Sequence, residues 1–142
     1  MRIIVFVSVA LIALHSVGMA EWSFETEQDP RTGRKITRAK LPEFGGRAAL
    51  IIRCSQRYAE PVVYLHQPAT GTHLRLIYRF DDDEAQNRLG SLSDSGHVLR
   101  IWDDVEKEAF ARAKRLRIQL RPFVVFDFDL RGIETIAAKI RC

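Results

Sequence analysis

The acidic run Asp81, Asp82, Asp83 and Glu84 is the densest group of potentially reactive side chains in this chain of 142 residues. Neighbouring carboxylates can act as acid and base when their environments separate their pKa values, and carboxylate oxygens also bind calcium. The run lacks the glycine and the distal glutamate of a calcium loop. No histidine stands within it to complete a triad, and the chain has no Gly-x-Ser-x-Gly motif. We therefore predict no catalytic residues, no metal site and no cofactor.

The acidic run opens the longest stretch without a repeating pattern, residues 81–96, whose second half is rich in serine and glycine. Segments of this length in a compact domain are usually functional or disordered. We expect a recognition loop here, and the alternative is a solvated surface loop without a partner. The expected recognition residues are Asp81, Asp82, Asp83, Glu84, Ser91, Ser93, Asp94 and Gly96.

Cys54 and Cys142 are the two cysteines of the chain. Cys54 ends the apolar run 48–54, which is typical of a strand covered on both faces. Two cysteines in an exported chain predict one disulfide between them. The alternatives are two free thiols or a metal pair, although no histidine stands at zinc-ligand spacing from either cysteine.

Residues 1–20 have the three parts of a secretory signal peptide. Arg2 supplies the positive charge, the segment up to Leu14 is apolar, and small residues precede the expected cleavage site at Ala20. The apolar segment is too short to span a bilayer, so cleavage is the prediction and an uncleaved anchor is the alternative. The mature chain, residues 21–142, is then a single periplasmic domain.

The formal net charge of the whole chain is +4, which does not suggest the concentrated basic field of a nucleic-acid-binding protein. The most basic stretch is 112–121, where alternation places Arg117 and Arg121 on one exposed face. That face could meet an anionic surface, and a solvated face without a partner is the alternative.

Alternating apolar and polar residues predict most of the secondary structure as strands. A helix is predicted to begin at Asp103, because Glu106 stands at capping-box spacing from it. The spacing of Ile133, Ile136 and Ile140 predicts a second helix close to the C-terminus. The expected fold class is α+β, a strand-rich antiparallel β-sandwich or open barrel with two helices late in the chain and one disulfide.

Several short motifs follow one another in an order that resembles a known family. They are Leu-x-x-Arg-Cys ending at Cys54, Tyr-Arg-Phe-Asp ending at Asp81, Ser-x-Ser-Asp-x-Gly ending at Gly96, Phe-Asp-Leu-x-Gly ending at Gly132, and the terminal Cys142. In this order they resemble the VasI family of type VI secretion-associated periplasmic proteins and its stand-alone relatives in proteobacteria and their phages. The resemblance implies a periplasmic accessory protein and no enzyme activity.

Three main functions are weighed on these features. The first is an exported accessory or interaction protein that binds a periplasmic protein. The second is an inhibitor or immunity-type protein that blocks a cell-wall hydrolase with residues 81–96. The third is a hydrolase that uses Asp81 and Asp83 as acid and base, and small-ligand binding is a further alternative.

Overall fold

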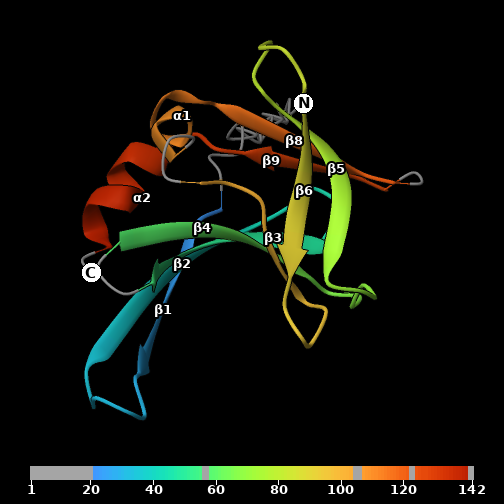
Figure 1. Ribbon diagram of the computed structural model, residues 1–142. Helices are drawn as coiled ribbons and strands as arrows, with labels where there is room; N and C mark the ends of the chain where they lie inside the picture. Colours follow the sequence, from blue (N-terminus) through green and yellow to red (C-terminus); the bar gives the residue numbers. More distant parts are fainter. Residues whose placement is uncertain (1–20, 56–57, 104–106, 122–123, 141–142) are drawn as a thin grey trace, which may run out of the picture.

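The computed structural model describes residues 21–55, 58–103, 107–121 and 124–140. These residues form nine strands and two short helices, so the expected strand-rich antiparallel domain with two late helices is confirmed (Figure 1). The strands are β1 (Ser23–Gln28), β2 (Lys35–Pro42), β3 (Ala48–Ser55), β4 (Tyr58–Leu65), β5 (His73–Phe80), β6 (Gln86–Leu92), β7 (Val98–Arg100), β8 (Arg115–Leu120) and β9 (Val124–Asp129). The helices are α1 (Lys107–Arg112) and α2 (Ile133–Lys139).

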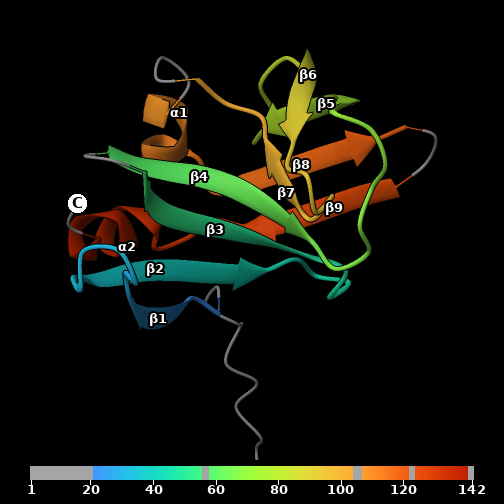
Figure 2. The same cartoon turned by 60° about the horizontal axis from the view of Figure 1, so that its bottom comes forward.

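All nine strands belong to one antiparallel sheet in the order β1-β2-β3-β4-β7-β6-β5-β8-β9. The sheet bends back on itself, so that the half with β2, β3 and β4 lies over the half with β8 and β9 (Figure 2). Both halves contribute to a single hydrophobic core, for example through Leu50, Val63, Ile118 and Phe128. The hydrogen bonding therefore describes one continuous bent sheet, and the separate sheets of a sandwich are not confirmed.

Strict alternation explains why the strands have a core side and a solvent side. In β8, Leu116, Ile118 and Leu120 are buried, whereas the residues between them are exposed. Successive side chains of a strand point to opposite faces, so the pattern fixes which face meets the core. We call the buried side of the sheet its inner face and the other side its outer face.

Both helices lie at one end of the bent sheet (Figures 1 and 2). The ring of Phe110 in α1 packs edge-on against Phe80 and Trp102, with centroid distances of 4.9 and 4.6 Å. Ile133 and Ile136 of α2 are buried, as the apolar spacing predicts. The expected capping box of the first helix includes Glu106, which lies outside the described residues.

The turn between β2 and β3 covers the outer edge of β9. The backbone N–H of Phe44 donates to the carbonyl of Asp127 at 3.1 Å, and the Arg47 guanidinium donates to the carbonyl of Val125 at 2.6 Å. Glu43 holds this turn by accepting from the Arg47 N–H at 2.9 Å. Burial raises the pKa of the Glu43 carboxyl, but hydrogen bonds from Arg47 and Gly45 outweigh it and leave that pKa below its ordinary value. This turn therefore joins the β2–β3 part of the sheet to its β9 edge.

Residues 81–96 are not one irregular segment, and that expectation was wrong. Residues 86–91 pair in register with β5, from Tyr78 opposite Gln86 to His73 opposite Ser91. Residues 86–89 and Ser91 are exposed, and Gly90 is the one buried residue among residues 86–91. Without a row of apolar side chains, the strand gives no alternation that a sequence pattern could detect.

Cys142 lies outside the described residues, so these residues do not include both cysteines of the expected disulfide. Cys54 is half-buried near the end of β3 and is not a free cysteine. Its pairing with Cys142 stays a prediction. The expected signal peptide, residues 1–20, also lies outside the described part. Within that part, no helix has the length and apolar character needed to cross a bilayer.

Candidate interaction surface

Arginines gather on the outer faces of β5 and β8. Arg75 and Arg79 alternate with buried residues of β5, and Arg79 lies directly opposite Arg117 of β8 in the sheet register. Arg121 follows β8 immediately and lines the same hollow as Arg75. We call this set the arginine face, and its members are Arg75, Arg79, Arg115, Arg117 and Arg121.

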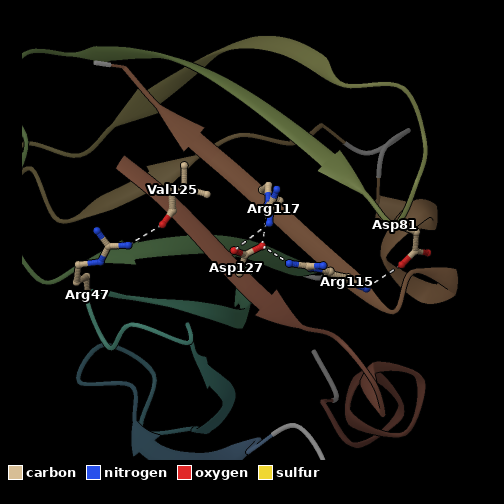
Figure 3. A network of polar contacts seen from close by, with 6 residues as sticks. All are labelled: Arg47, Asp81, Arg115, Arg117, Val125 and Asp127. Atoms are coloured by element: carbon tan, nitrogen blue, oxygen red, sulfur yellow. Dashed lines mark hydrogen bonds and ion pairs between the residues drawn. The ribbon is translucent and has the colours of Figure 1, made fainter. Parts of the chain in front are cut away.

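Asp127 on the neighbouring strand β9 compensates two of these charges (Figure 3). Its Oδ1 atom lies 3.0 Å from Nε of Arg117 and 3.1 Å from Nη2 of Arg115. Partial burial raises the pKa of the Asp127 carboxyl, but hydrogen bonds and charge from the two arginines outweigh it and lower that pKa. The same hydrogen bond raises the pKa of Arg117. Asp127 is therefore ionised at neutral pH and holds both guanidinium groups over β9.

Asp81 lies beside the arginine face and joins the end of β5 to the start of β8. Its carboxylate accepts hydrogen bonds from the backbone N–H groups of Lys114 at 3.0 Å and of Arg115 at 2.9 Å (Figure 3). Its own N–H donates to the Arg115 carbonyl at 3.0 Å. Asp81 has a φ of 47°, a left-handed conformation that aspartate tolerates better than most residues. The contacts of this expected recognition residue are thus structural.

Arg75, Arg79 and Arg121 have no ion pair with any described carboxylate. Arg75 and Arg121 line a hollow of about 280 Å³ together with Arg88, Leu89, Asn87 and Leu76. No carboxylate is among these lining residues, and Leu89 is 59% exposed. This part of the surface therefore presents cations around an exposed apolar side chain.

The expected recognition residues Ser91, Ser93 and Asp94 line a different hollow, of about 320 Å³, with Arg53 and Arg100. These two arginines are compensated, because both lie near the Glu60 carboxylate, at 3.6 and 3.1 Å. The Ser93 hydroxyl accepts a hydrogen bond from the Val98 N–H at 3.1 Å and so shapes the turn between β6 and β7. This hollow is nearly neutral and is less suited to an anionic partner than the arginine face.

Gly96 occupies a position that only glycine fits. It has a φ of 76°, and a Cβ atom there would lie 2.3 Å from the carbonyl oxygen of Ala69. Its N–H donates to the carbonyl of Ser93 at 2.9 Å. The structure thus gives Gly96 a role in the turn rather than on a recognition surface.

The remaining expected residues, Asp82, Asp83 and Glu84, are exposed in the turn between β5 and β6. This turn projects from the body of the domain (Figure 1). Asp82 also lines a hollow of about 260 Å³ with Arg79, Asp81, Arg115 and Arg117. The eight expected recognition residues are therefore distributed over separate places and do not form one surface.

Arg75 was not singled out by the sequence analysis. Arg79 was expected away from the apolar face of its strand, as the structure confirms. It was also expected to pair with a carboxylate such as Asp81, whose carboxylate instead accepts from the N–H groups of Lys114 and Arg115. Arg117 and Arg121 were expected on one exposed face. The alternation within β5 placed its arginines away from the core. The missing information was the partner strand, because β8 begins 34 positions after Asp81 in the chain and only the register brings Arg79 opposite Arg117.

The described residues contain no group of three or more histidine, cysteine, aspartate or glutamate side chains placed to hold a metal ion. No protein-family model, curated protein or solved structure matches the chain. The surface itself therefore carries the functional argument.

Proposed function

We propose that the protein is an exported periplasmic accessory protein that binds another protein through its arginine face and does not act by catalysis. The observation that carries this proposal is the cross-strand pair of Arg79 and Arg117. Like charges directly opposite each other destabilise an antiparallel pair. Asp127 relieves this repulsion at Arg117. Arg79 makes no ion pair with a described carboxylate, although Asp81 and Asp82 line the same hollow. An anionic partner would supply the missing charge.

The chemistry of arginine supports a protein partner. A guanidinium group offers a planar fork of donors that matches a carboxylate, and arginine is enriched in protein interfaces. The arginine face lies on sheet strands rather than on a loop, so the backbone that carries it is already ordered before binding. Less conformational entropy is then lost on association.

The periplasmic setting rests on the sequence. The predicted signal peptide of residues 1–20 directs export, and the predicted disulfide of Cys54 and Cys142 suits an oxidising compartment. The resemblance to the VasI family supports association with type VI secretion.

An inhibitor or immunity-type protein that blocks a cell-wall hydrolase is the second candidate. The acidic turn with Asp82, Asp83 and Glu84 favours it, because this turn projects from the domain and its side chains are exposed. In that case, the turn would enter a cationic cleft of the hydrolase.

The proposal is tested with a variant in which Arg75, Arg79 and Arg121 are all replaced by Gln. The matched control replaces Arg31, Arg34 and Lys35 by Gln, because these residues are also exposed and the change in net charge is the same. We expect the first variant to lose the periplasmic protein that the wild type captures, and the control to retain it.

Equal losses in the two variants would show that only net charge matters and would contradict the proposal. Retention in both would also contradict it. A third variant, with Asp82, Asp83 and Glu84 replaced by Asn, Asn and Gln, separates the two candidates. Loss of capture and of hydrolase inhibition in this variant alone would favour the inhibitor.

A further inference from the structure

β6 is paired over only part of its length on one side. Residues 86–91 pair with β5, but β7 pairs only with Ser91 and Leu92. After Arg100 the chain turns into the core, where Ile101 and Trp102 are buried. Among the described residues, no strand continues beside residues 86–90 on the β7 side.

The hydrogen-bond pattern shows which backbone groups face this open edge. The Leu92 N–H donates to the Thr72 carbonyl at 2.8 Å. Bonded and non-bonded pairs alternate along an antiparallel ladder, so Gly90, Arg88 and Gln86 bond with β5. The N–H and C=O groups of Asn87 and Leu89 therefore point away from β5. Such a row of free backbone groups is a template for an added strand.

The other open edges are less suited to accept a strand. The edge of β9 is covered by the turn that contains Phe44. The unpaired half of β4 contains Pro61, which has no N–H to offer. The edge of β1 is open, but Glu25 lies in it. Proline, lysine and bulges usually protect edges, and residues 86–90 contain neither proline nor lysine.

The charges around the β6 edge indicate which kind of segment would bind. Arg75 and Arg121 line a hollow together with the exposed Leu89, and no carboxylate is among its lining residues. An added strand would place every second side chain over the outer face, where Arg75 and Arg121 lie. We propose that an extended, acidic segment of the partner protein adds as a strand to the β6 edge at Asn87 and Leu89. This inference rests on the proposed function and specifies how the partner is held.

A second copy of this chain is a poorer occupant. Its acidic strand β1 could reach the β6 edge, but this contact would join two different surfaces of the molecule. A heterologous contact of this kind closes into a ring or continues as a filament. A partner segment avoids this outcome, so the test treats self-association as a contrary result.

The probe is a capped octapeptide of alternating glutamate and threonine, with binding measured by calorimetry. Leu89→Pro removes an N–H that faces the open edge and does not bond with β5, whereas Leu89→Thr is the matched control that keeps it. We expect the affinity to fall about tenfold for Leu89→Pro and less than about threefold for Leu89→Thr. The amide protons of Asn87 and Leu89 should also become protected from exchange in the complex.

A second measurement does not depend on the folding of a proline variant. Two isomeric peptides carry N-methyl groups on either the glutamate or the threonine nitrogens, so that each blocks one edge of the extended peptide. Wild-type protein should bind one isomer like the parent peptide and lose the other. Equal binding of both isomers would overturn the inference, because the peptide edge would then be irrelevant.

Three further outcomes would also overturn it. They are absence of peptide binding, binding of anionic phosphatidylglycerol vesicles in place of the peptide, and concentration-dependent self-association that Leu89→Pro abolishes. Capture of the periplasmic partner separates the two proposals. If the arginine-face variant loses capture and Leu89→Pro retains it, the proposed function stands and strand addition fails. If both variants retain it, the proposed function itself fails.

Discussion

At the scale of single residues, Asp81 shows how a side chain expected to recognise a partner also orders the fold. Its carboxylate binds two consecutive backbone N–H groups at the start of β8, and its backbone bonds to Arg115. The arginine face depends on this junction, because Arg115 and Arg117 are positioned by the strand that begins here. Asp81 thus contributes to the surface through the backbone.

Replacing Asp81 by Ala is expected to destabilise the protein by about 1–2 kcal/mol, because two N–H groups lose their acceptor. Asp81→Asn should cost less, since its amide oxygen still accepts and asparagine tolerates a positive φ. Asp81→Gly relieves the φ of 47° but removes the acceptor, and should fall between the two. Urea unfolding of the three variants provides the measurement. Equal stability of the Ala variant and the wild type would show that the carboxylate contributes nothing.

At the scale of elements, β8 and β9 are joined by charge as well as by backbone hydrogen bonds. Asp127 bonds to Arg117 and Arg115, while Asp129 binds Arg131 just beyond β9. The hydrogen bond from Arg131 lowers the pKa of the Asp129 carboxyl, which partial burial only partly opposes. Glu43 in the adjoining turn also has a lowered pKa. The acidic groups that hold this side of the sheet therefore favour the ionised state when folded.

These directions give a pH dependence of a definite sign. In the unfolded chain the carboxyls take their ordinary pKa values of 3.8 for Asp and 4.5 for Glu, so below these values the unfolded state binds more protons than the folded state. Stability from these groups is present above about pH 5 and is lost as the pH falls through their lowered folded values. Melting curves from pH 7 to pH 3 should show a falling Tm.

Asp127→Asn is the matched variant for this test. It should melt a few degrees below the wild type at pH 7, and the difference should shrink as the pH falls below the ordinary aspartate pKa of 3.8 towards the lowered pKa of the folded wild-type carboxyl. The effect stays modest because the side chains of Arg117 and Arg115 are 45% and 56% exposed. A difference that stays constant over this range would assign it to packing rather than to ionisation.

The elements that the sequence predicted are those with apolar side chains on one face. β8 and α2 are examples, because alternation in the first and the spacing of Ile133 and Ile136 in the second report burial directly. β6 was not predicted, since its exposed half has no core side chains. Its buried residue, Gly90, has no side chain and packs closely against Leu99: a Cβ atom added to Gly90 would lie 2.7 Å from Cδ1 of Leu99. Its strand state comes from pairing with β5, which is tertiary information.

The arginine face was predicted only in part for a related reason. The exposed side of β8 follows from local alternation, but the approach of Arg79 to Arg117 depends on a pairing between strands distant in the chain. Strand order and register are not contained in a local pattern. The open edge of β6 likewise becomes visible only when β7 is seen to end at Arg100.

At the scale of the whole molecule, one bent sheet surrounds one core, with two helices at one end and the Phe44 turn along β9. This arrangement keeps the arginine face and the β6 edge on a common, ordered scaffold. The predicted disulfide would act on the same scale. Cys54 lies near the end of β3, and the described chain ends at Ile140 after α2, two residues before Cys142.

We expect the exported protein to consist of residues 21–142 and to lack two hydrogens because Cys54 and Cys142 are joined. The disulfide would close a loop that includes most of the domain, and the restriction of the unfolded chain should stabilise the fold by about 2–4 kcal/mol. Intact-mass measurement tests both parts together, and reduction should restore the two hydrogens. Urea unfolding should show the same loss of stability for Cys54→Ser as for the wild type after reduction of its disulfide. A mass that includes residues 1–20 would contradict the signal peptide, and two titratable thiols in the denatured, unreduced protein would contradict the disulfide.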